Sequence, residues 1–285
     1  MNSLITILAA VIPSAVLVHH FYRQDKRKPE PLDKIIKLFF LGLISLVLVL
    51  VPERILVIFF DQFITNSLAN NFLIAFVVAA LCEESIKFII VRKFIYNDDR
   101  FDEIKDGIFY TIVVALGFAC AENIWYVVNY GIEIIQVRAL FAVPLHASAS
   151  GIMGYYIGKA KFSQSKKEER DNFVKGLCIA IAIHGLYDFV VFVEGSFISF
   201  IINAIILIAA FKFLYNKINV AILENEINEN SKSSSSRIAP KIQEPISTPP
   251  VHPLFKKEIE NIADKKKVEE KIVKKGYKKG DLYNK

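Results

Sequence analysis

Four helix-length apolar segments of this chain carry ionisable side chains at positions that a lipid-facing helix would not tolerate. These residues are Glu83, Glu84 and Lys87, then Glu122, then His146, and then His184 with Asp188. A charged side chain near the centre of a bilayer costs about 2.5–3.5 kcal/mol on scales derived from membrane insertion. We therefore expect these side chains to face one another, or a watery cavity, inside a bundle of helices. Their residue types are those that carry acid–base or metal chemistry.

The composition indicates an integral membrane protein. Hydrophobic residues make up 53% of the 285 residues, and the mean hydropathy of +0.38 is too high for a soluble globular chain of this length. A helix needs about 20 mostly apolar residues to cross the hydrocarbon core. Seven stretches approach this length, near 4–22, 35–51, 72–91, 106–127, 137–160, 172–193 and 196–215. We predict an all-α fold: a polytopic membrane helix bundle of about seven transmembrane helices.

One further apolar run, at residues 55–64, follows Pro52, Glu53 and Arg54. It is too short to span, so we expect a short interfacial or re-entrant segment.

Lysine and arginine are distributed unevenly between the predicted loops, and such residues accumulate on the cytoplasmic side. The loops after the first, third and fifth spans are basic. The alternate loops hold only Arg54 in 52–71, and no basic residue at 128–136 or 194–195. The pattern predicts an N-terminus outside and a C-terminus in the cytoplasm.

Residues 216–285 differ in composition from the rest of the chain. They hold 15 basic and 10 acidic residues, a serine-rich run at 231–236 and five prolines between 240 and 253. We therefore predict two domains, a transmembrane domain at 1–215 and a largely disordered, basic cytoplasmic tail at 216–285. The tail either binds anionic lipid or is a solvated segment that helps to set the topology. Nucleic-acid binding has no support beyond this charge, and we do not expect it.

Spacing within the spans brings charged groups onto common helix faces. Glu83 and Lys87 are four residues apart and can pair, unless Lys87 extends to the cytoplasmic surface. Glu84 is rotated by about 100° from Glu83 and is predicted to face a neighbouring helix. His184 and Asp188 are also four residues apart, and an aspartate can orient an imidazole or bind a metal with it.

Two of the polar residues also have structural interpretations. Glu122 lies near Trp125 and Tyr126 and fits an interfacial carboxylate beside an aromatic belt. His146 follows Pro144 and fits a histidine that is satisfied by a backbone carbonyl.

Taken in order, these motifs resemble the PrsW family of intramembrane proteases. The resemblance rests on Glu83-Glu84-x-x-Lys87, Gly117-Phe118-x-x-x-Glu122-Asn123, His146 and His184-x-x-x-Asp188, supported by Phe21-Tyr22-Arg23, Pro29-Glu30-Pro31 and Asp106-Gly107. It covers about residues 10–195, and the order of the motifs in successive spans makes it specific. The family is similar to the CAAX-processing and bacteriocin-immunity membrane proteases. There the second motif normally ends in histidine, where this chain has Glu122.

The resemblance implies an intramembrane endopeptidase of the bacterial cytoplasmic membrane that cleaves a membrane-anchored protein, such as an anti-sigma factor in a stress response. The implied catalytic residues are Glu83, Glu84, Glu122, His146, His184 and Asp188. We expect Glu83 or Glu84 to activate a water as general base. His146 and His184 would then stabilise the oxyanion, and Asp188 would orient His184.

An alternative mechanism places a divalent metal, zinc, among Glu122, His146, His184 and Asp188. We favour the metal-free version because the chain contains no His-Glu-x-x-His motif.

Two classes outside the peptidases also fit the polar spans. A proton- or ion-coupled transporter would use the same side chains as a relay. A sensor or scaffold would use them only to specify helix packing.

Overall fold

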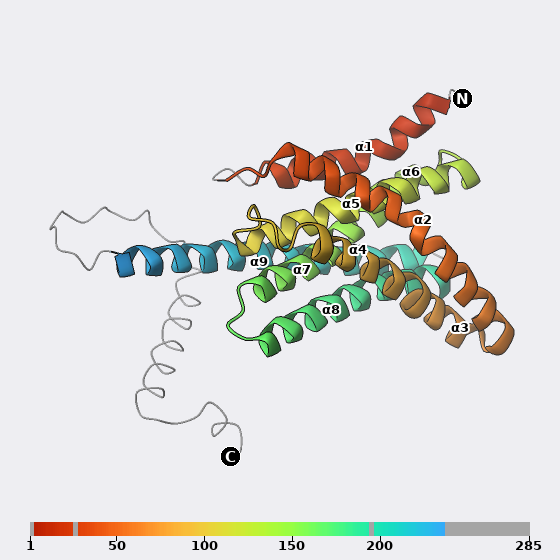
Figure 1. The fold of residues 1–285 in the computed structure, drawn as a ribbon. Coiled ribbons are helices and arrows are strands. Elements are labelled where there is room, and N and C mark those ends of the chain that lie inside the picture. The colour runs from red at the N-terminus through yellow and green to blue at the C-terminus, as the bar shows by residue number, and fades with distance from the viewer. Residues whose placement is uncertain (1–2, 25–27, 194–196, 237–285) are drawn as a thin grey trace, which may run out of the picture. The chain divides into compact units, whose positions relative to one another are not determined.

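The computed structural model describes residues 3–24, 28–193 and 197–236, and every regular element in these ranges is helical (Figure 1). The elements are α1 (Ser3–Tyr22), α2 (Leu32–Phe63), α3 (Ser67–Leu73), the π-helix η1 (Ile74–Ala80), α4 (Leu81–Phe94), α5 (Ile104–Tyr130), α6 (Ile134–Leu140), α7 (Ala142–Lys161), α8 (Lys166–Val193) and α9 (Phe197–Ser236). The all-α prediction is confirmed.

Four of the described helices are long and apolar enough to cross a membrane, namely α2, α5, α8 and residues Phe197–Ile227 of α9. A shorter apolar helix occupies Ile7–Tyr22. The third predicted span is a continuous helical path of three elements, because Leu73 and Ala80 keep right-handed helical torsions where α3, η1 and α4 meet. The fifth is broken at Phe141, which separates α6 from α7 with φ −122° and ψ −62°. The chain is an integral membrane protein.

The sequence predicted a separate interfacial or re-entrant segment at residues 55–64, and this prediction is wrong. Helix α2 continues through Pro52 and ends at Phe63. A proline inside a helix removes one hydrogen bond and kinks the backbone without requiring that the helix stop. Leu50 and Val57, on either side of Pro52, line the same internal cavity. Packing on one continuous face therefore favours a single helix.

Helix α9 crosses the predicted domain boundary at residue 215 and ends at Ser236. Its Glu224 lies 3.0 Å from Lys159 Nζ, and the side-chain oxygen of Asn225 accepts a hydrogen bond of 3.1 Å from the Ile104 amide. These contacts attach residues 224 and 225 to α5 and α7. Residues 216–236, which were predicted to belong to the largely disordered tail, are helical, and residues 237–285 lie outside the described residues.

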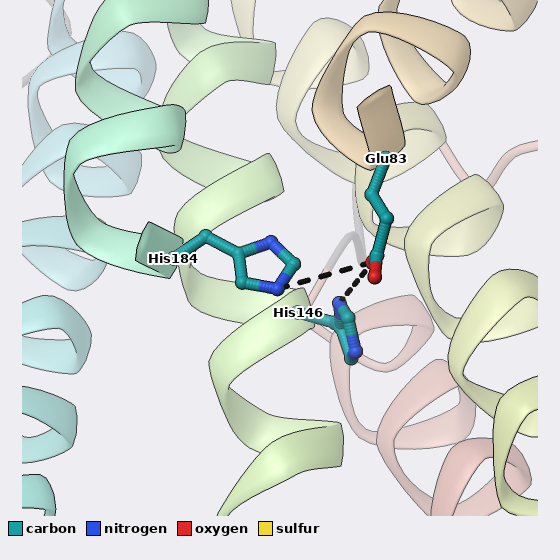
Figure 2. Close-up of side chains that lie close together, drawn as sticks. All are labelled: Glu83, His146 and His184. Atoms are coloured by element: carbon teal, nitrogen blue, oxygen red, sulfur yellow. Dashed lines mark ion pairs between the residues drawn. The ribbon is translucent and has the colours of Figure 1, made fainter. Parts of the chain in front are cut away.

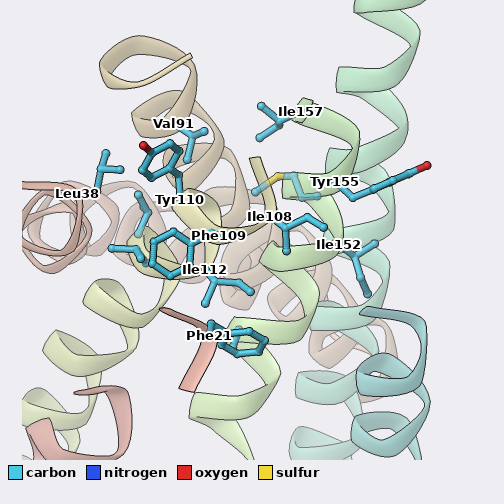
Figure 3. Packing of buried hydrophobic residues seen from close by; sticks show 14 of the residues in the cluster. Phe21, Leu38, Val91, Ile108, Phe109, Tyr110, Ile112, Ile152, Tyr155 and Ile157 are labelled. Carbon is cyan, nitrogen blue, oxygen red and sulfur yellow. The ribbon is translucent and has the colours of Figure 1, made fainter. Parts of the chain in front are cut away.

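Helix α5 forms the centre of the bundle, and almost every residue from Ile104 to Ala121 is buried. Apolar side chains of α5 and α7 interdigitate there (Figure 3). Glycines allow the close approach, because a Cβ at Gly117 would lie 2.0 Å from the Phe39 oxygen of α2. A Cβ at Gly154 of α7 would lie 2.3 Å from the Gly107 oxygen of α5. Small residues are favoured at such contacts because lipid provides no hydrophobic force between helices.

The three basic loops meet at one end of the bundle. Lys28 lies 3.1 Å from Glu103, Lys34 pairs with Asp98, and Lys161 donates a 3.1 Å hydrogen bond to the Asp98 backbone oxygen. The hydrogen bond from Lys34 holds the pKa of Asp98 below its ordinary value. Loops assigned to one side of the membrane thus lie together, as the predicted topology requires.

Candidate active site

The paired glutamates lie in the first turn of α4, directly after the π-helical segment η1. Segments of π-helix are rare in proteins, and many of those that occur lie at functional sites. Glu83 lines a cavity, whereas the Glu84 side chain is completely buried behind the cavity wall. Adjacent residues on one helix thus face different surroundings, as their rotation of about 100° predicts.

Glu84 joins three helices through hydrogen bonds. Its Oε1 accepts a 2.8 Å bond from Lys87 and lies 2.9 Å from His184 Nδ1, while its Oε2 accepts a 2.7 Å bond from Ser150. These partners lie on α4, α8 and α7. A carboxylate held on both oxygens and closed off from the cavity is suited to positioning His184.

Lys87 is fully buried and does not extend to the cytoplasmic surface. Its Nζ lies 2.8 Å from Glu84, 3.2 Å from Glu83 and 3.0 Å from His146 Nδ1. It also lies 4.5 Å from the centroid of the Phe118 ring. The two carboxylates compensate the loss of hydration that a buried ammonium suffers, so the predicted pairing of Glu83 with Lys87 is confirmed.

Glu83, His146 and His184 converge from α4, α7 and α8 (Figure 2). Glu83 Oε2 lies 3.9 Å from His146 Nδ1 and 3.8 Å from His184 Nε2. The two imidazole rings are nearly perpendicular, with centroids 5.0 Å apart. One donor atom from each residue lies within 4.8 Å of the others. Two imidazoles and a carboxylate are a donor set that catalytic zinc uses in peptidases, so these residues fit a divalent metal.

Lys87 shares one of these donors, because its ammonium lies 3.0 Å from His146 Nδ1. The ammonium and a metal ion would compete for the same lone pair. Metal binding therefore requires Lys87 to release His146 Nδ1 and to contact only Glu83 and Glu84.

Glu122 contacts His146 at the other ring nitrogen. Its Oε2 lies 2.9 Å from His146 Nε2 and 2.7 Å from Arg138 Nη2. Arg138 also donates a 2.7 Å hydrogen bond to Asn123 and lies 3.9 Å above the Tyr126 ring. Glu122 is thus outside the Glu83–His146–His184 group, in contrast to the metal set predicted from the sequence. The difference arises because Arg138 draws this carboxylate to the far side of the imidazole.

Asp188 lies beside His184, with 3.3 Å between Asp188 Oδ2 and His184 Nε2. Their four-residue spacing predicted this pair. Asp188 also lies outside the group of three donors.

The site opens into a cavity of about 360 Å³. One wall carries five of the six predicted residues, Glu83, Glu122, His146, His184 and Asp188. Leu46, Leu50, Glu53 and Val57 of α2 also line the cavity. The cavity reaches Tyr126 and Phe192, near the ends of α5 and α8 that lie away from the basic loops.

A membrane helix bundle with Glu83, Glu122, two histidines and an aspartate around one cavity has the residue types of a membrane-embedded hydrolase. The family model described as "PrsW family intramembrane metalloprotease" matches residues 30–215. The chain belongs to this family and is a membrane-embedded protease.

Curated relatives support this assignment along most of their length. Protease PrsW of Geobacillus kaustophilus is 39% identical over 185 residues, which are 64% of this chain and 77% of the relative. Protease PrsW of Clostridioides difficile is 31% identical over 229 residues, or 79% and 92% of the two chains. Protease PrsW of Bacillus subtilis is 34% identical over 203 residues, or 69% and 87%. No solved structure shows a significant match.

Three side chains at the site were not predicted from the sequence. Arg138 falls within the predicted span at 137–160, Glu53 precedes the short apolar run at 55–64, and Ser150 was not considered as a site residue. The signal for Arg138 and Glu53 was their charge within or beside an apolar stretch. Ser150 carries no such signal, because serine is common between membrane helices.

Replacing Arg138 by glutamine is expected to lower the cleavage rate about ten- to hundredfold, the usual cost of losing an outer partner of a ligand histidine. Glu122 would lose its cation and His146 its fixed orientation. Initial rates on a single-span substrate would measure the effect, with Arg138→Lys recovering part of the loss. The matched control is Arg92→Gln, because Arg92 is 39% exposed and lies outside the cavity. A normal rate for Arg138→Gln would exclude a positioning role.

Proposed function

We propose that this protein is a metal-dependent intramembrane endopeptidase in which Glu83, His146 and His184 hold a divalent ion, with zinc as the best candidate. The observation that carries the proposal is the convergence of these three donors within 4.8 Å. The description of the family as a metalloprotease supports it. The proposal reverses our preference from the sequence, which relied on the absence of a local His-Glu-x-x-His motif. Here the donors come from three different helices.

A zinc ion at these donors would supply a Lewis acid and a bound water with a pKa near 7. The chain's own side chains orient the donors. Glu84, to which Ser150 donates a hydrogen bond, contacts Nδ1 of His184, so Nε2 of His184 faces Glu83. Glu122 holds Nε2 of His146, so its Nδ1 faces Glu83. Each carboxylate thereby selects the tautomer that leaves the inward nitrogen available.

Proton transfer requires a carboxylate on the cavity wall beside the donor group. Asp188 meets this requirement, because it lines the cavity 3.3 Å from His184 Nε2. We assign it to accept the proton of the attacking water and to pass a proton to the leaving amine. In the metal-free alternative, Glu83 takes this role between the two imidazoles.

The substrate class follows from the position of the site inside the membrane domain. A peptide bond reaches Glu83 only if a membrane-anchored chain enters the cavity between α2 and the polar wall. The family resemblance implies a single-span anti-sigma factor as one such substrate. We infer that the end with the basic loops faces the cytoplasm, with the N-terminus outside, and that anionic lipid binds the basic tail.

The test is incubation of the purified protein, in detergent or lipid nanodiscs, with a panel of single-span substrates, followed by mass spectrometry of the products. We expect cleavage within or next to the membrane segment of at least one substrate. Reconstitution into proteoliposomes with a proton-sensitive dye tests the transporter alternative. Proton flux without cleavage of any substrate would overturn the proposal.

A further inference from the structure

Helix α2 presents one stripe of side chains to the cavity that the catalytic groups line. Leu46, Leu50, Glu53 and Val57 all line it. Their spacing of four, three and four residues places them on a single face of the helix. Glu53 is thus a carboxylate set into an otherwise apolar wall, directly after Pro52.

Glu53 differs from the other carboxylates at the cavity because one of its oxygens is buried without a donor from the described residues. Its Oε1 is buried and has no hydrogen-bond partner among the described residues. Glu83 is paired with Lys87, Glu122 with Arg138, and Asp188 contacts His184. Buried polar atoms in proteins nearly always have a partner, so the arrangement calls for a donor that comes from outside the described part of the chain.

The charges around the site indicate what kind of donor this is. Five carboxylates surround it, from Glu53, Glu83, Glu84, Glu122 and Asp188, against the two cations Lys87 and Arg138. A divalent ion at the donor group would leave one negative charge uncompensated. Glu53 lines the same cavity as Glu83 and Glu122, and neighbouring carboxylates disfavour one another's ionised form unless a cation joins them. A cationic donor compensates both the charge and the missing hydrogen bond, whereas a neutral backbone amide supplies only the bond.

We propose that Glu53 is a specificity-determining residue that binds a lysine or arginine side chain of the substrate. The inference rests on the proposed function and names the substrate class more narrowly: membrane-anchored chains with a basic residue close to the scissile bond. Because Glu53 lines the same cavity as the catalytic groups, the basic residue stands at a fixed number of residues from the cut.

The experiment uses a cleaved single-span substrate in which each position near the cut is replaced in turn by lysine or by methionine. Methionine keeps a long unbranched side chain and removes the charge. The enzymes are the wild type, Glu53→Gln and Asp61→Asn. Asp61 is the matched control, because it is an exposed acid on the same helix that does not line the cavity. The measurement is the ratio of kcat/KM for the lysine substrate to that for the methionine substrate.

At one position the wild type is expected to prefer lysine about ten- to hundredfold, the range for a hydrogen bond to a charged group. The ratio should fall close to one in Glu53→Gln and persist in Asp61→Asn. A wild type without lysine preference at any position overturns the proposal. So does a Glu53→Gln variant that keeps the preference, including one that cleaves every substrate more slowly by the same factor.

Failure of this inference is distinguishable from failure of the proposed function. If the wild type cleaves no substrate, the proposed function fails, and the same lysine and methionine substrates are compared by binding affinity to wild type and Glu53→Gln. Tighter binding of the lysine substrate that depends on Glu53 then supports the role of Glu53 without any cleavage. Equal binding of the two substrates refutes that role.

Discussion

Replacing Glu83 by glutamine is expected to reduce proteolysis by about 10²–10⁴-fold, the range over which a positioned acid–base group contributes. Glutamine keeps the volume of the side chain but loses the carboxylate that faces His146 and His184. The effect holds whether Glu83 binds a metal or acts as the base. Initial cleavage rates of purified protein would measure it, with membrane abundance checked by immunoblot.

The matched control is Glu133→Gln, because Glu133 is exposed and does not line the cavity. Glu84→Gln is the informative companion. It weakens the bonds to Lys87 and His184, so we expect reduced activity together with lower thermal stability. Normal cleavage rates in both Glu83→Gln and Glu84→Gln would show that neither of these two acids serves the reaction.

Metal removal is expected to inactivate the enzyme, and added zinc should restore it. A chelator that reaches the cavity would withdraw the ion from Glu83, His146 and His184. The single substitutions His146→Ala and His184→Ala should lose bound metal and activity together, because each removes one of three donors. Metal content by mass spectrometry provides a measurement that does not depend on cleavage.

The exposed histidine His20 offers the control, because His20→Ala should keep both metal and activity. His20 contacts Tyr215 and Gln24 and does not line the cavity. If the protein cleaves at full rate in chelator and co-purifies with no stoichiometric metal, the metal-dependent mechanism is wrong and the metal-free mechanism is supported. His146→Ala should then still be slow, since that mechanism needs the imidazole at the oxyanion.

Local spacing determined part of the site before any tertiary contact was known. His184 and Asp188 pair because residues four apart share a helix face, and Glu83 meets Lys87 for the same reason. The cost of charge in lipid also required the polar residues to turn inward. These inferences depend only on helix geometry and on the cost of charge in the lipid bilayer, so the sequence was sufficient for them.

The partner of each polar side chain across helices was decided by the tertiary structure. Glu122 contacts His146 and Arg138 instead of a metal, and Glu84 lies behind the cavity while Glu83 lines it. Ser150 donates a hydrogen bond to Glu84 because α7 packs against α4.

By itself, the sequence determined that this is a helical membrane protein with its acids and histidines turned inward. Helix period and insertion cost are properties of single segments, and they can be read one segment at a time. The tertiary structure alone decided that Pro52 leaves α2 continuous, that Arg138 holds Glu122, and that Glu53 lines the same cavity as the catalytic groups. Those outcomes depend on how closely the helices approach, which is set by contacts such as Gly117 against the Phe39 oxygen. No single segment contains that information.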